Sequence, residues 1–159
     1  MRRRALLLMI ALAIPTLAAA IDGVRPFTGD SFAKIVSART NRPFVVAFWS
    51  VNCAHCPAEL RALGELRGRY PQLDIVLVAT DTPDDVAAAA RLAKGYGLGS
   101  AEQWLFADAI PERLYISVDR GWHGELPRTY FFDKAHQVEA VSGVISPDKL
   151  ESRVREHLR

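Results

Sequence analysis

The sequence predicts a single α/β domain with a central mixed β-sheet flanked by helices. Its length of 159 residues suits one domain, and 50% hydrophobic with 24% charged residues is typical of a globular protein. From Ile21 onward, apolar runs typical of buried strands alternate with segments of helical periodicity, without repeats or long linkers. One such strand runs directly into two closely spaced cysteines, at the start of a helix.

The first twenty residues predict a secretory signal peptide (1–20), which leaves residues 21–159 as the domain. Arg2–Arg4 provide the positive charge, Ala5–Ile14 the apolar segment and Ala18–Ala20 the small residues before the cleavage site. An uncleaved membrane anchor is the alternative, although Pro15 interrupts an apolar run that is shorter than the roughly 20 residues of a membrane span. Both interpretations place the domain in the periplasm, where disulfides persist.

The composition excludes several classes of function. Arg2–Arg4 are the only charged residues of the leader, so the domain carries 17 basic and 18 acidic residues, and no nucleic-acid partner is expected. Both methionines, Met1 and Met9, lie in the leader, which excludes a methionine-ligated copper or haem site in the domain. Cys53 and Cys56 are the only cysteines, so the domain is held together by burial rather than by several disulfides.

The first half of the domain is expected to fold as helix, strand, helix and strand. Phe44–Trp49 is an uninterrupted apolar run, typical of a strand buried on both faces. Apolar residues recur at helical spacing from Cys56 until Pro71, and Leu73–Ala79 repeats the strand pattern. The apolar faces of the two expected helices consist of Phe32, Ile35 and Val36, and then of Leu60, Leu63, Leu66 and Tyr70.

A further helix is expected after the second strand. Thr82 is a good N-cap and Pro83 suits the first helical position, and the helix is expected to end at Gly95 or Gly97. Residues 100–125 have the weakest pattern of the chain, with a short strand expected at 103–106 and weak helical periodicity at 110–118.

The chain is expected to end with a β-hairpin and a helix. Thr129–Phe132 follows Pro127, which a strand tolerates at its start, and pairs with Gln137–Val141 through the turn at 133–136. A cap at Ser146-Pro147-Asp148 then begins a helix with Leu150, Val154 and Leu158 on one face.

The segment Cys53-Ala54-His55-Cys56 is expected to be a redox-active pair. The strand-to-helix position is expected to put Cys53 at the helix N-terminus and Cys56 one turn inside. Free amides and the helix dipole at that end stabilise the Cys53 thiolate, so Cys53 is the expected nucleophile and Cys56 the resolving thiol. A protonated His55 adds a positive charge beside Cys53, which favours a more oxidising pair than a Gly-Pro spacer does.

Two structural roles for the cysteines are alternatives to redox exchange. A zinc site needs two more ligands, and the histidines at 123, 136 and 157 lack the usual spacing of a second ligand pair. A purely structural disulfide would close a very short loop and would remove little entropy from the unfolded chain. Redox exchange is therefore favoured, and neither a metal nor another cofactor is expected.

These motifs resemble the thioredoxin superfamily and, within it, the TlpA-like extracytoplasmic thiol-disulfide oxidoreductases. The resemblance rests on Val45–Ser50 running into the Cys53–Cys56 segment, on Leu126-Pro127 before a strand that ends at Asp133, and on the order of the elements. It implies a thioredoxin-like fold. It also implies that Pro127 is a cis-proline lying against the disulfide, and that the backbone of Leu126 pairs with a substrate strand.

The sequence departs from this family at positions near the cysteines. Asn52 stands where the family usually has tryptophan, and Ala47 stands where cytoplasmic thioredoxins carry a buried aspartate that moves the proton of the second cysteine. Glu59 matches a glutamate common in TlpA-like reductases, so the resemblance assigns that proton transfer to it. The alternative is that Glu59 is a solvated acid on a helix face. Arg128 replaces a threonine often found after the cis-proline and is a second expected substrate contact.

The function expected from the sequence is a periplasmic thiol-disulfide oxidoreductase that exchanges disulfides with exported proteins. Reduction is the favoured direction, for example in the assembly of cytochrome c or of a copper site, with electrons from an upstream membrane or periplasmic redox partner. One alternative is a DsbA-like disulfide donor, which His55 favours. The other is a thioredoxin-fold metallochaperone that holds Cu(I) on Cys53 and Cys56, against which the missing methionines weigh. The membrane is involved only through an uncleaved leader.

Overall fold

The computed structural model describes residues 23–157, so the expected leader and Leu158 lie outside the described residues. The strands are β1 (Val24–Phe27), β2 (Phe44–Trp49), β3 (Ile75–Ala79), β4 (Glu102–Phe106), β5 (Arg128–Phe132) and β6 (Val138–Ser142). The helices are α1 (Ser31–Ser37), α2 (Cys56–Arg69), α3 (Val86–Gly95), α4 (Pro111–Val118) and α5 (Pro147–His157), and a 3₁₀ turn, η1 (Pro83–Asp85), precedes α3.

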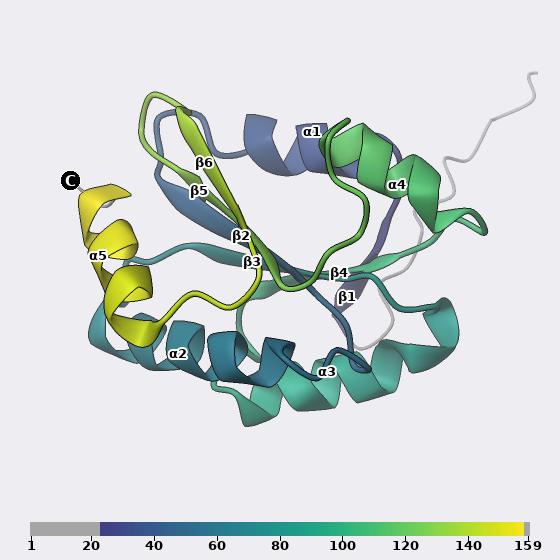
Figure 1. Ribbon diagram of the computed structural model, residues 1–159, viewed down its shortest axis with the longest axis horizontal. Helices are drawn as coiled ribbons and strands as arrows, with labels where there is room; N and C mark the ends of the chain where they lie inside the picture. The colour runs from purple at the N-terminus through teal and green to yellow at the C-terminus, as the bar shows by residue number, and fades with distance from the viewer. Residues whose placement is uncertain (1–22, 158–159) are drawn as a thin grey trace, which may run out of the picture.

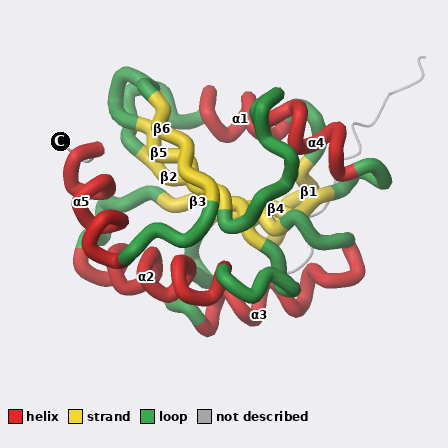
Figure 2. The backbone as a smooth tube through the Cα atoms, in the orientation of Figure 1, coloured by secondary structure: helices red, strands yellow, loops and turns green. Residues whose placement is uncertain are grey.

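The strands form one mixed sheet in the order β1-β4-β3-β2-β5-β6. The first four strands of that order run parallel to one another, whereas β5 is antiparallel to both of its neighbours. Helices α1 and α4 cover one face of the sheet, and α2, α3 and α5 cover the other (Figure 1). The strands thus lie as a single layer between two layers of helices, which Figure 2 shows in yellow and red.

Alternation along each strand divides the core into two clusters. In β2, Val45, Ala47 and Trp49 face the α2 side, while Phe44, Val46 and Phe48 face the α1 side. All six residues of β2 are buried, which explains their uninterrupted apolar pattern, because both faces of the strand are covered by helices. The predicted single α/β domain with a mixed sheet is confirmed.

Most predicted elements are confirmed, with local corrections. The strand Phe44–Trp49 has the predicted bounds, whereas the next strand begins at Ile75 and not at Leu73. The helix after Thr82 begins with a 3₁₀ turn rather than an α-helical one. The weakly patterned region contains both β4 and α4. Strand β1 was not predicted, because this edge strand of four residues contains Pro26 and is too short to show alternation.

Helix α2 packs closely against the end of α3 at Gly64. A Cβ atom at Gly64 would lie 1.8 Å from the carbonyl oxygen of Tyr96. Tyr96 caps α3, and its N–H donates to the carbonyl of Leu92, so the backbone at this point is held in place. The close approach of the two helices therefore requires glycine at position 64.

No described helix is long and apolar enough to cross a membrane.

We predict that Gly64→Ala destabilises the protein by about 1–3 kcal/mol, because the added methyl group overlaps the Tyr96 carbonyl. Gly68→Ala is the matched control on the same helix, where a Cβ atom meets nothing within 4 Å. Since alanine favours a helix over glycine, this control is expected to gain about 0.5–1 kcal/mol. Urea unfolding of both variants at constant m-value measures the two effects, and equal stabilities would contradict the packing argument.

Candidate redox site

The candidate site lies at the carboxyl end of β2, where three segments of the chain meet. Because β3 is parallel to β2, the residues that follow β3 lie beside those that follow β2, as the pairing of Trp49 with Ala79 shows. Because β5 is antiparallel to β2, its beginning lies at the same edge, with Arg128 opposite Phe48. The sheet thus brings the cysteines, the segment after β3 and Leu126-Pro127 together.

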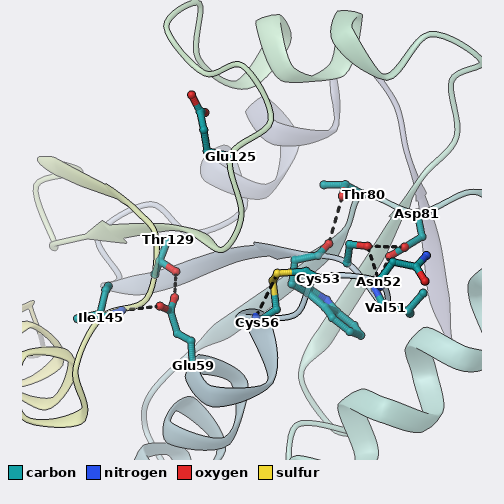
Figure 3. The surroundings of a disulfide bond; sticks show 12 residues. Val51, Asn52, Cys53, Cys56, Glu59, Thr80, Asp81, Glu125, Thr129 and Ile145 are labelled. Atoms are coloured by element: carbon teal, nitrogen blue, oxygen red, sulfur yellow. Dashed lines mark hydrogen bonds between the residues drawn. A yellow bond between two sulfur atoms is a disulfide. The ribbon is translucent and has the colours of Figure 1, made fainter.

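Cys53 and Cys56 form a disulfide with their Cα atoms 5.4 Å apart (Figure 3). Helix α2 begins at Cys56 with His55 as its N-cap, so the prediction that Cys53 is at the helix N-terminus and Cys56 one turn inside is wrong. The amide of Cys56 nevertheless donates to the Cys53 sulfur over 3.1 Å. The N-terminal amide therefore still reaches the Cys53 sulfur, although Cys53 itself lies before the helix.

The two sulfur-bearing residues differ in accessibility. Cys53 is half-buried, whereas Cys56, the first residue of α2, is completely buried in the core cluster on the α2 side of the sheet. A reaction partner can therefore reach Cys53 more easily than Cys56.

Leu126 and Pro127 lie at the start of β5 and are joined by a cis peptide bond. Pro127 is buried, and its carbonyl accepts a hydrogen bond from the amide of Gly143 over 2.8 Å. Leu126 is half-buried and packs against both core clusters. Within residues 23–157, its backbone N–H and carbonyl have no hydrogen-bond partner, so they are available for another chain.

Glu59 is a buried carboxylate and not a solvated one. Its side chain is 1% exposed, so the alternative of a solvent-facing helix residue is wrong. The carboxylate accepts hydrogen bonds from the Thr129 hydroxyl and, over 3.0 Å, from the amide of Ile145. Burial raises the pKa of Glu59, and these two hydrogen bonds oppose that rise.

The Glu59 carboxylate lies near Ala47 of β2. Thr129 is the β5 residue paired with Ala47 in β2, so a carboxylate from α2 reaches the sheet next to Ala47 (Figure 3). Glu59 lies one helical turn from Cys56, within the range of side-chain neighbours on a helix. A buried acid is thus present on the second cysteine's side of the site, although it comes from a different element.

His55 is exposed to solvent, whereas the Arg128 side chain is bound by its neighbours. His55 is exposed and makes no side-chain capping hydrogen bond. The guanidinium of Arg128 donates to Asp119 and Ser142, each over 2.8 Å, and to the Tyr130 hydroxyl over 3.2 Å. The Arg128 side chain therefore ties the loop after α4 to β5 and β6, and its expected substrate contact stays a prediction.

Asp81, which was not predicted as a site residue, follows β3 and supports the segment before Cys53. Its carboxylate accepts hydrogen bonds from the Ser50 hydroxyl over 2.7 Å and from the Val51 amide over 3.0 Å. An acidic residue directly after a buried parallel strand is a usable signal, because the carboxyl ends of neighbouring strands share one edge. In the described part of the chain, no group of three or more His, Cys, Asp or Glu residues could hold a metal ion.

Comparison with known proteins yields a match to solved structures only. Neither a protein-family model nor a curated protein matches the chain. A secreted Mycobacterium tuberculosis disulfide oxidoreductase, described as homologous to E. coli DsbE, matches with 23% identity and a TM-score of 0.60, over 76% of this chain and 85% of that one.

Two further structures agree with this match. A thiol:disulfide interchange protein of the thioredoxin family from Chlorobium tepidum has 15% identity and a TM-score of 0.62, over 77% of this chain and 84% of that one. A DsbF homologue from Corynebacterium diphtheriae has 17% identity and a TM-score of 0.59, over 76% of this chain and 75% of that one. The mixed sheet, the disulfide at the end of β2 and these matches together show that the chain has the thioredoxin fold.

Proposed function

We propose that the protein is a periplasmic thiol-disulfide oxidoreductase that exchanges disulfides with exported proteins. The observation that carries this proposal is the Cys53–Cys56 disulfide, with a half-buried first cysteine and a buried second one, at the edge of the sheet where β5 begins. The fold is shared with proteins described as disulfide oxidoreductases.

In the reductive direction, the Cys53 thiolate attacks one sulfur of a substrate disulfide, and the other substrate sulfur leaves as a thiolate. The thiolate of Cys56 then attacks the Cys53 sulfur of the mixed disulfide and releases the second substrate thiol. The substrate has gained two electrons and two protons, and the pair is oxidised to the disulfide. A dithiol of an upstream membrane or periplasmic partner reduces the pair again.

Two groups assist these steps in the proposal. Glu59 accepts the proton of Cys56 when that thiol becomes the attacking thiolate, since its raised pKa suits a base that must also release the proton. The unpaired backbone of Leu126 binds an extended substrate segment as an added strand, which places the substrate sulfur at Cys53.

The cellular location is part of the proposal and rests on the leader. A charged segment, an apolar segment and small residues precede the domain, as in exported proteins. The Mycobacterium tuberculosis relative in fold is described as secreted, which is consistent with this location. Exported proteins with thiols or disulfides are then the partners, and equilibration with glutathione buffers decides between a reductase and a DsbA-like donor.

We predict that Cys56→Ser accumulates mixed disulfides in a periplasmic extract, because the Cys53 adduct can no longer be resolved. Cys53→Ser is the matched control, and it is expected to trap little because its remaining thiol is buried. Non-reducing gels with and without dithiothreitol measure the adducts. Equal trapping by the two variants would contradict the assignment of Cys53 as nucleophile, and no trapping by either would contradict disulfide exchange.

We predict that Glu59→Gln slows resolution by Cys56 about a hundredfold, the lower range for loss of a general base. Glu65→Gln on the exposed side of α2 is the control and leaves the rate unchanged. Release of a thiol from a preformed mixed disulfide, followed by stopped flow, gives the rate. A Glu59→Gln rate equal to that of the control would exclude Glu59 as the base.

The same variant is predicted to change how stability depends on pH. Because burial raises the pKa of Glu59, the folded protein prefers the protonated acid, and its contribution to stability is lost as pH rises through the folded-state pKa. Glutamine has no such loss, so the stability of Glu59→Gln relative to wild type increases from about pH 4 to neutral pH. Urea unfolding across this range measures it, and a constant difference would contradict the raised pKa.

A further inference from the structure

The segment between β2 and Cys53 is tied to the two residues that follow β3. The Trp49 carbonyl accepts hydrogen bonds from the amide of Thr80 over 2.8 Å and from its hydroxyl over 3.3 Å. Asp81 binds the Ser50 hydroxyl and the Val51 amide (Figure 3). Every residue from Trp49 to Val51 is thus held from β3.

This support continues to the cysteine. The Ser50 hydroxyl, which donates to Asp81, also accepts a hydrogen bond from the amide of Asn52 over 3.0 Å. The Ser50 carbonyl accepts a hydrogen bond from the amide of Cys53 over 3.2 Å. Asp81 therefore holds the turn on which Cys53 lies. A displacement of its carboxylate would move the backbone that carries the Cys53 sulfur.

The carboxylate of Asp81 is also a buried charge without a cation beside it. Asp81 is 8% exposed, and within residues 23–157 it forms no salt bridge. Burial and the charge of Glu112 raise the pKa of Tyr115 in α4, a hydrogen bond with Thr80 lowers it, and the charge of Asp81 adds a smaller rise. A negative charge bound to the turn that carries Cys53 disfavours a thiolate there.

The other charged and titratable groups around the pair do not neutralise Asp81. His55, the N-cap of α2, is exposed, and the Glu59 carboxylate accepts hydrogen bonds from Thr129 and Ile145. Arg128 is paired with Asp119. Neighbouring segments also contribute Tyr115 and Glu112 of α4, Glu125 of the loop before β5, and Asp108, which lines a groove of about 390 Å³ together with Asp81.

We infer that Asp81 is a positioning residue of the cysteine pair, whose carboxylate holds the turn before Cys53 and whose charge biases the pair toward the disulfide. The inference rests on the proposed function, because it assumes that the pair undergoes exchange. The inference has a consequence for the direction of disulfide exchange. A charge that disfavours the Cys53 thiolate stabilises the oxidised form relative to the dithiol, so the protein becomes a stronger reductant. Asp81 thereby opposes the oxidising effect expected from His55.

The test compares Asp81→Asn with two control variants of the purified protein. Asp81→Asn removes the charge and retains one acceptor for the turn. Ser50→Ala removes hydrogen bonds of the same turn and retains the charge. Asp108→Asn removes a carboxylate that lines the same groove as Asp81. That carboxylate accepts a hydrogen bond from the Ile110 amide and not from the turn before Cys53.

Two measurements are made on each protein. The pH dependence of alkylation of the reduced protein reports the Cys53 thiolate. Equilibration with glutathione follows the reaction of the protein disulfide and two glutathione thiols to the protein dithiol and one oxidised glutathione. We expect Asp81→Asn to lower the alkylation midpoint by about one pH unit, the lower range for a nearby charge, and to shift the equilibrium up to about tenfold toward the dithiol, about 30 mV. Asp108→Asn is expected to match wild type, and Ser50→Ala, which retains the charge of Asp81, is expected not to lower the alkylation midpoint.

The outcomes separate this inference from the proposed function. If Asp81→Asn matches wild type in both measurements, or if Ser50→Ala or Asp108→Asn reproduces its shift, the inference is overturned while disulfide exchange stands. If the wild-type pair does not equilibrate with glutathione at all, the proposed function itself fails.

Discussion

Burial of β2 on both faces is the constraint on which the site depends. Because helices cover both faces of this strand, its six residues are all apolar and buried, and the first polar group can appear only where the strand ends. The cysteine pair lies just beyond that end. The neighbours of β2 then decide what surrounds the pair, since the parallel β3 brings its following residues to this edge and the antiparallel β5 brings its beginning.

Two buried carboxylates lie near this edge and contact different segments of the chain. Glu59 comes from α2 and is bound by Thr129 and Ile145, so it belongs to the buried side of the pair where Cys56 lies. Asp81 comes from the end of β3 and is bound to the turn before Cys53. Burying a carboxylate is costly unless it is hydrogen-bonded, and both of these are.

The predicted elements that were confirmed are those with strong local signals. The continuous apolar run of β2, the spaced leucines of α2 and the hairpin of β5 and β6 each carry their pattern within a few residues. The elements that were missed or shifted lack such a pattern. Strand β1 is four residues long, and the start of α2 depends on where the backbone turns after the disulfide, which no side-chain periodicity records.

The sequence by itself determined the α/β class, the buried strand that leads to Cys53 and Cys56, and the place of Pro127 before a later strand, because burial periodicity and turn chemistry are local properties of the chain. Only the tertiary structure decided that Glu59 is buried against Thr129 and that Asp81 holds Ser50 and Val51. These contacts join residues 70 and about 30 positions apart. They exist because the sheet order places β3 and β5 on either side of β2, and strand order is set by packing of the whole chain rather than by any local pattern.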